Sequence, residues 1–193
     1  HRRADIRRAV SLLREHDFHI SLDLIFGVPH QTLADWKTAL DEALDLQPHH
    51  LSTYGLTFEK GTSFWTRREQ GLLPQAPDEL ERDMYALVMD YLPTQGFPQY
   101  EISNFAPPAF ECRHNQVYWS GDHYYGHGPG AARYLDGTRA TNHRSVTTWL
   151  NRLDRGLSPL MEQETLEPQH RARELLFLGL RRNAGINRAD FLH

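Results

Sequence analysis

Residues 19 to 26, H-I-S-L-D-L-I-F, are the segment of the sequence that most clearly indicates the fold class. The run is almost continuously apolar, and Gly27 and Pro29 end it. A short run that is apolar on both faces is typical of a parallel strand covered by helices on each side. We therefore predict a buried strand here, interrupted near its end by one carboxylate, Asp23.

Helical patterns flank this strand. One helix is predicted over residues 5–16, and a capping-box-like pair, Thr32 and Asp35, opens a second over residues 32–44. Another apolar strand follows over residues 50–58. Helix, strand, helix, strand at this spacing predicts an α/β fold with right-handed crossovers onto a parallel sheet.

Shorter elements are predicted along the remaining chain. They are a polar loop over 61–76, a helix over 78–92, a strand over 99–102, a hairpin turning at Asp136-Gly137 and an amphipathic helix over 146–153, closed by Gly156. We expect one domain over residues 1–156, a linker over 157–167 and the start of a further domain over 168–193.

The composition is that of an ordinary globular protein and excludes several classes. Hydrophobic residues make up 39% and charged residues 24% of 193, enough for one substantial core. The net charge of −4 offers no basic field for nucleic acid, and no apolar run is long enough for a membrane-spanning helix. The single Cys112 excludes an internal disulfide framework or cysteine-held iron–sulfur cluster and is typical of the reducing cytoplasm.

Asp23 is the first candidate site residue. A carboxylate inside an apolar strand costs free energy unless backbone donors or a ligand satisfy it. Ligands of α/β folds gather at the carboxyl ends of strands, which favours a ligand over a purely structural aspartate.

The second candidate site is the segment from Glu111 to Arg133, which concentrates histidine, tyrosine, tryptophan and glycine. His114, Tyr118 and Trp119 fall at i, i+4 and i+5, and we predict that they share one face of a helical turn. An imidazole can ligate iron axially, and aromatic rings can line a planar macrocycle. The glycines would let the backbone approach a flat ligand closely.

The string H-N-Q-V-Y-W over 114–119, followed by Y-Y-G-H-G-P-G-A over 124–131, resembles the heme-chaperone branch (HemW) of the radical S-adenosylmethionine (SAM), oxygen-independent coproporphyrinogen oxidase-like family. D-L-I-F-G-V-P-H-Q-T over 23–32 is also similar, with Val28 in place of the usual leucine. Further resemblances lie in H-L-S-T-Y-G-L-T-F-E-K-G-T over 50–62, Y-E-I-S-N-F-A over 100–106 and E-L-L-F-L-G-L-R-R-N-A-G-I over 174–186.

The resemblance implies the second half of a partial (β/α) radical SAM barrel with parallel strands, and the start of a small helical, winged-helix-like C-terminal domain. It implies that SAM contacts Asp23, Thr57 and Ala132. It implies that heme contacts His114, Asn115, Tyr118 and Trp119. The cysteines of the family's [4Fe-4S] cluster would lie upstream of His1, so we expect the chain to be part of a longer protein and to bind no metal by itself.

Three functions are compatible with these features. The first is a cytoplasmic heme chaperone that passes heme to an acceptor protein. The second is an oxygen-independent coproporphyrinogen III oxidase, whose branch differs where this chain has H-N-Q-V-Y-W. The third is a metallohydrolase using Asp122, His123 and His127, but the glycines and Pro129 around these residues make a metal-binding helix improbable.

Overall fold

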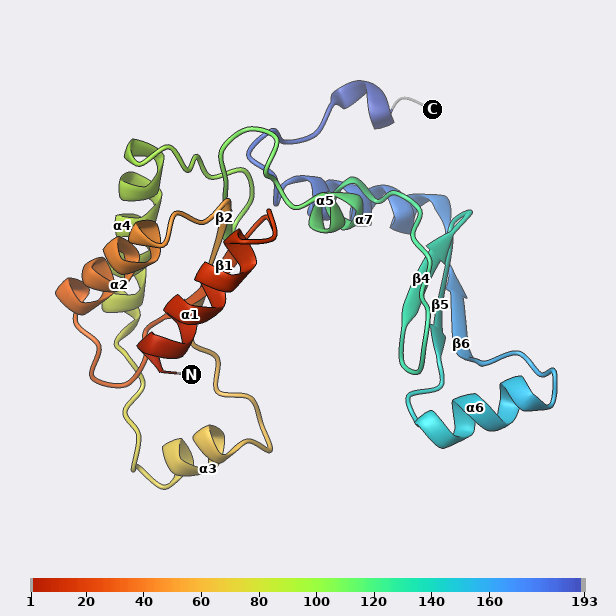
Figure 1. Cartoon of the computed structure of the whole chain (residues 1–193). Helices are drawn as coiled ribbons and strands as arrows, with labels where there is room; N and C mark the ends of the chain where they lie inside the picture. Colours follow the sequence, from red (N-terminus) through yellow and green to blue (C-terminus); the bar gives the residue numbers. More distant parts are fainter. Residues whose placement is uncertain (1, 192–193) are drawn as a thin grey trace. The chain divides into compact units, whose positions relative to one another are not determined.

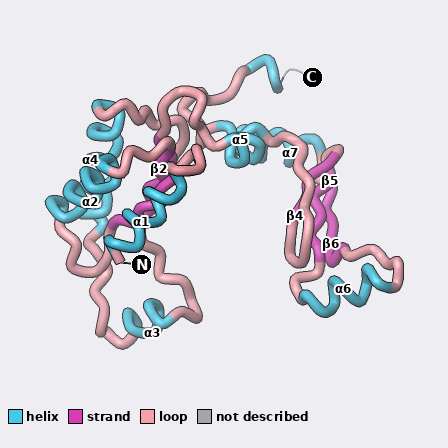
Figure 2. The backbone as a smooth tube through the Cα atoms, in the orientation of Figure 1, coloured by secondary structure: helices cyan, strands magenta, loops and turns pink. Residues whose placement is uncertain are grey.

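The computed structural model describes residues 2–191, and the chain divides into two compact units, residues 1–111 and 112–193. The first unit contains α1 (Arg3–Arg14), β1 (Ser21–Phe26), α2 (Leu33–Asp45), β2 (His50–Gly55), α3 (Ser63–Glu69), α4 (Asp78–Thr94) and β3 (Asn104–Phe105) (Figure 1). The second contains α5 (Arg113–Ser120), β4 (Ala132–Leu135), β5 (Thr138–Asn142), α6 (Val146–Asp154), β6 (Leu160–Thr165), α7 (Pro168–Gly179) and the 3₁₀ helix η1 (Arg188–Phe191) (Figure 2).

The sheet of the first unit has the order β1-β2-β3. β1 and β2 are parallel, as predicted, with Ser21 opposite His50 and Phe26 opposite Gly55. β3 is antiparallel to β2, so the sheet is mixed rather than wholly parallel. The α/β class is thereby confirmed, with this difference in strand direction.

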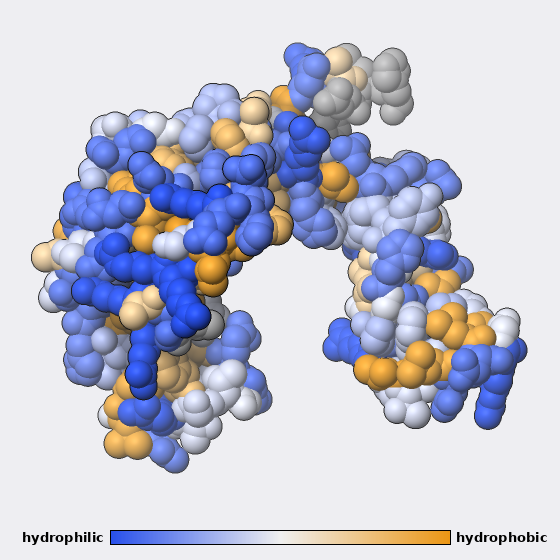
Figure 3. All heavy atoms as spheres, viewed as in Figure 1, coloured by the Kyte–Doolittle hydropathy of each residue, from blue (hydrophilic) through white to orange (hydrophobic). Residues whose placement is uncertain are grey.

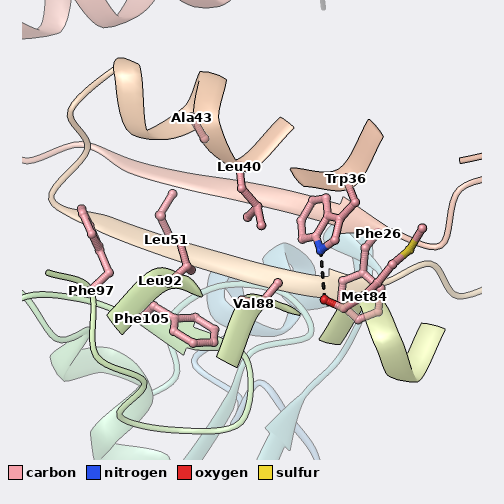
Figure 4. Packing of buried hydrophobic residues seen from close by; sticks show 10 residues of the cluster. All are labelled: Phe26, Trp36, Leu40, Ala43, Leu51, Met84, Val88, Leu92, Phe97 and Phe105. Atoms are coloured by element: carbon pink, nitrogen blue, oxygen red, sulfur yellow. Dashed lines mark hydrogen bonds between the residues drawn. The ribbon is translucent and has the colours of Figure 1, made fainter. Parts of the chain in front are cut away.

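The core of the first unit lies where α2 and α4 pack against one face of the sheet. Its buried side chains come from both helices and all three strands (Figure 4): Phe26, Trp36, Leu40, Ala43, Leu51, Met84, Val88, Leu92, Phe97 and Phe105. The capping box predicted for α2 is present, because the Thr32 hydroxyl accepts from the Asp35 N–H. The Trp36 indole also donates to the Met84 carbonyl at 3.1 Å, which ties α2 to α4.

β1 is not buried on both faces, contrary to the prediction. Leu22, Leu24 and Phe26 pack toward the core, whereas Asp23 and Ile25 are exposed. β1 is an edge strand, and in the described residues its second face is not covered by a helix layer. Asp23 is therefore neither buried nor at the end of the strand, but exposed in its middle.

Three other local predictions of the first unit need correction. β2 ends at Gly55 rather than at residue 58, and the predicted loop over 61–76 contains α3, whose cap Thr62 accepts from the Trp65 N–H. The strand predicted over 99–102 is only a bridge between Gln99 and Phe105. The bounds of these elements depend on hydrogen bonds, and the periodicity of apolar residues in the sequence does not identify the partners of those bonds.

The second unit is built on an antiparallel sheet of order β4-β5-β6. The predicted hairpin is confirmed: Asp136 and Gly137 both have positive φ, 48° and 78°, as a type I′ turn requires. The expected linker over 157–167 was wrong, because it contains β6, which pairs with β5. This strand is nearly all polar and exposed, so backbone pairing rather than an apolar pattern defines it.

Helices cover the second unit unequally. α5 packs against α7, whereas α6 presents Val146, Leu150 and Leu153 as exposed apolar side chains in the described part of the chain (Figure 3). None of the helices within residues 2–191 has both the length and the apolar character needed to cross a bilayer.

Candidate functional site

A row of polar side chains crosses the sheet of the first unit. Asp23 lies opposite Ser52 in the register of β1 and β2, and Ser52 lies opposite Asn104 in that of β2 and β3. Paired residues of neighbouring strands point to the same face, here the face opposite the helices. Ser52 and Asn104 are buried, while Asp23 keeps its carboxylate in solvent. The row therefore offers an accessible carboxylate beside neutral polar groups.

His50 adds a hydrogen-bonded group next to this row. Its Nδ1 lies 3.0 Å from the Ser21 hydroxyl and its Nε2 lies 2.8 Å from the Tyr100 hydroxyl. Burial lowers the pKa of His50, and the negative charge of Asp23 opposes that shift only in part. A neutral imidazole thus links the exposed end of β1 to the segment before β3.

Glu101 is another buried polar residue, and it was not identified as a candidate from the sequence. Its side chain is only 2% exposed, and its carboxylate accepts from the Ser103 N–H and the Asn104 side-chain amide. The Asn104 Oδ1 is buried and has no hydrogen-bond partner among the described residues. The polar residues of the segment Y-E-I-S-N-F could have indicated this hydrogen-bonded cluster from the sequence, because buried polar side chains need specific hydrogen-bond partners.

The three residues proposed to contact SAM do not form one cluster within either unit. Thr57 is exposed and lies two residues beyond the end of β2. Asp23 and Thr57 belong to the first unit, while Ala132 is the first residue of β4 in the second.

The H-N-Q-V-Y-W string forms most of α5, as expected. The His114 Nε2 and the Tyr118 hydroxyl are 3.1 Å apart, and their rings meet edge to face with centroids 4.9 Å apart. His114 is exposed, whereas Asn115, Tyr118 and Trp119 are half-buried. Tyr118 also contacts the ring of Tyr124 at 4.7 Å.

Trp119 does not share the face of His114 and Tyr118, contrary to the prediction. At about 100° per residue, position i+5 lies roughly 140° from position i around a helix, whereas i+4 lies only about 40° away. The Trp119 ring instead lies under the guanidinium of Arg181, 4.4 Å from its centroid. The motif therefore presents two separate aromatic surfaces.

The glycines after α5 serve the chain's own packing. Gly121 ends α5 with φ of 66°. A side chain at Gly126 would overlap the backbone of Ala132, since Tyr124 and Tyr134 pair as a bridge beside it. The Asn142 side chain donates to the Gly128 carbonyl at 2.9 Å and holds the loop. The packing against Ala132 is by itself a reason for glycine at position 126.

The histidines of this loop have unrelated partners. The Asp136 N–H donates to His123 Nε2 at 3.3 Å, and His127 stacks on Tyr125. The loop is not helical, as its glycines predicted, and no group of three potential metal ligands occurs within residues 2–191. The geometry of a metallohydrolase site is not formed by these residues.

Arg171 of α7 joins three parts of the second unit. Its guanidinium lies 4.2 Å from the Tyr134 ring, donates to the Gly121 carbonyl at 2.7 Å and pairs with Glu174 at 3.5 Å. Glu174 also pairs with Arg139 of β5 at 2.5 Å. α7 thereby fixes the end of α5 to the β4-β5 hairpin.

Comparison with known proteins identifies relatives along nearly the whole chain, although no family model matches it. The chain is 37% identical to "Heme chaperone HemW" of Bacillus subtilis, over 99% of this chain and 51% of that protein. It is 40% identical to the protein of the same name from Synechocystis, over 98% and 47%. It is 35% identical to the mitochondrial "Radical S-adenosyl methionine domain-containing protein 1" of Danio rerio, over 86% and 39%.

A solved structure shares the fold. The structure of coproporphyrinogen III oxidase (HemN) from Escherichia coli, described as a radical SAM enzyme, superposes with a TM-score of 0.76. The match covers 95% of this chain and 45% of that one at 20% identity. The chain spans about half the length of the curated relatives it matches. On the strength of the sequence matches, the chain belongs to the HemW/HemN-like family of radical SAM proteins.

Proposed function

We propose that the protein containing this chain is a cytoplasmic heme chaperone, which binds heme and transfers it to an acceptor protein. The observation that carries the proposal is the H-N-x-x-Y-W string on α5, with an exposed imidazole beside a tyrosine. The relatives that are named heme chaperones support it.

His114 has the chemistry that heme ligation needs. Its imidazole is accessible to a ligand, and its hydrogen bond with the Tyr118 hydroxyl uses Nε2. An imidazole nitrogen is a common axial ligand of heme iron. In this proposal Tyr118 orients the ring of His114, Asn115 lies beside it on α5, and Trp119 contributes its separate aromatic surface.

The protein is also proposed to bind SAM and a [4Fe-4S] cluster. The exposed carboxylate of Asp23 suits hydrogen bonds from ligand hydroxyls, and Thr57 and Ala132 are assigned to the same ligand. The cluster does not fit this chain, whose single cysteine cannot replace the three or four thiolates required. Its ligands are therefore assigned to residues outside the chain, and no catalytic residue is assigned within it.

The second candidate function is oxygen-independent coproporphyrinogen III oxidase. The likeness to the Escherichia coli enzyme favours it, but at 20% identity that likeness concerns the fold. The H-N-Q-V-Y-W string distinguishes the two candidates and favours the chaperone.

Substitution of His114 by alanine tests the chaperone proposal. In the full-length protein, His114→Ala should remove the ligation-shifted Soret band and weaken heme binding at least about tenfold, because the axial bond is lost. Heme titration followed by absorbance measures both quantities.

His127→Ala is the matched control, because it removes an imidazole from the neighbouring glycine loop. It should leave the Soret band and the affinity unchanged. Wild-type heme binding by His114→Ala, or loss of the band in His127→Ala instead, would contradict the assignment of His114.

Asp23→Asn tests the proposed SAM contact. In the full-length protein the substitution should weaken SAM binding by about 1–3 kcal/mol, the range for a hydrogen bond to a charged group. Thermal stability should stay the same, because the Asp23 side chain is exposed. Calorimetric titration with SAM measures the effect, and Asp45→Asn, also exposed in the first unit, serves as the control. Unchanged SAM affinity in Asp23→Asn would refute the contact.

A further inference from the structure

The second unit contains a cavity next to Trp119. Its volume is about 510 Å³, within the range of small-molecule sites, and it lies between the end of α5, α7 and the segment that follows α7. Trp119, Leu175 and Ile186 form its apolar wall, while Asp122 and Arg182 contribute charged groups. His114 does not line this cavity.

Two neighbouring arginines at this place lack an acidic partner. The Arg181 guanidinium lies on the Trp119 ring, and its Nε is buried without a hydrogen-bond partner among the described residues. Arg182 donates to the Ser120 hydroxyl at 3.0 Å. Neither arginine forms an ion pair in residues 2–191, even though Asp122 lines the same cavity.

Two other arginines of the second unit do have an acidic partner. Arg139 and Arg171 both pair with Glu174, and Arg139 also lies 4.0 Å from Glu164, so each has an acidic partner inside the fold. Arg182 thus faces the cavity without an acidic partner. Arg181 does not line the cavity; its guanidinium lies against the Trp119 ring that forms part of the apolar wall. A guanidinium that lacks an acidic partner suits bidentate binding of a carboxylate.

We infer that the cavity beside Trp119 is a subsite for the carboxylate-bearing edge of a planar, apolar ligand, with Arg182 as the carboxylate partner. A porphyrin with two propionates has this chemistry, so the inference rests on the proposed heme-binding function. Arg181 acts there as a positioning residue, because its guanidinium lies against the Trp119 ring, which forms part of the cavity wall. Iron ligation by His114 is not needed for binding at this subsite.

Metal-free protoporphyrin IX and its dimethyl ester are matched probes for the full-length protein. They share the macrocycle and differ only in the two carboxylates. Protoporphyrin IX should bind about tenfold more tightly than the ester, and Arg182→Gln should remove about tenfold of the acid's affinity while leaving the ester unaffected. Arg181→Gln, which removes the support of the Trp119 ring, should weaken the acid and the ester alike. Porphyrin fluorescence measures both affinities.

Arg173→Gln is the charge-matched control, since Arg173 is an exposed arginine on α7 away from this cavity. It should leave both affinities unchanged, and circular dichroism should show that all variants are folded. If the wild-type protein binds protoporphyrin IX and its dimethyl ester equally tightly, the inference is wrong, whatever the variants show. If the variants keep protoporphyrin binding while His114→Ala loses the heme spectrum, the subsite is wrong and the chaperone proposal stands. Absence of any heme or porphyrin binding in the wild type would overturn both.

Discussion

Replacement of Gly126 by alanine is expected to destabilise the second unit by about 3 kcal/mol, the upper range for overpacking a tight site. A Cβ at this position would overlap the carbonyl oxygen of Ala132 and lie 2.5 Å from its carbonyl carbon. Backbone atoms held in a strand cannot turn aside as a flexible side chain can. The bridge between Tyr124 and Tyr134 would have to open, and β4 would lose its contact with the glycine loop.

Gly185→Ala separates this overlap from ordinary backbone strain. Gly185 has a positive φ, 67°, unlike Gly126, but a Cβ there meets no atom within 4 Å, so only the backbone strain of about 1 kcal/mol should be lost. Thermal unfolding, combined with hydrogen exchange of the amides in residues 112–193, measures both variants. Equal losses of stability in the two variants would show that the contact with Ala132 is not tight.

Trp36→Ala should have the largest effect in the first unit, a loss of about 3–5 kcal/mol. The ring is 1% exposed, fills the space between α2, α4 and the sheet, and lies 5.6 Å from the ring of Phe26 (Figure 4). Its removal leaves a cavity and also removes the hydrogen bond to the Met84 carbonyl.

Trp65→Ala is the matched control in the same unit, because Trp65 is only half-buried on α3 and packs against Arg68. It should cost clearly less stability than Trp36→Ala. Trp36→Phe should lie between them, since it keeps an aromatic ring but loses the N–H. Denaturant unfolding followed by far-ultraviolet circular dichroism measures all three, and a Trp65 variant as unstable as the Trp36 variant would contradict this account of the core.

The sequence correctly predicted those features that depend on interactions between neighbouring residues. The cap at Thr32 and the positive φ values at Asp136-Gly137 depend on neighbouring residues, and both are confirmed. β6 could not be predicted in this way, because its polar, exposed residues are ordered by pairing with a strand some twenty residues earlier. The exposure of Asp23 likewise depends on which face of the sheet the helices cover, which the apolar run alone does not specify.

The candidate site shows the same division. The helix that carries H-N-Q-V-Y-W was predictable, and helical geometry by itself would have separated Trp119 from His114. The contact of Trp119 with Arg181 spans 62 positions of sequence, and that of His50 with Tyr100 spans 50. Such pairings are properties of the tertiary fold, and no spacing rule identifies them in a single sequence.

The attachment of α5 to α7 limits how far the proposed heme motif can be transferred to another protein. α5 has only eight residues, and isolated helices shorter than about 12–15 residues are marginal in water. Its end is held by Arg171, fifty positions further along the chain, and by Leu175 packed against Gly121. A synthetic peptide or a grafted loop with the same six residues would therefore have the sequence of the motif but would not keep its helical conformation. A transferable form of this motif therefore has to include α7 as well as α5.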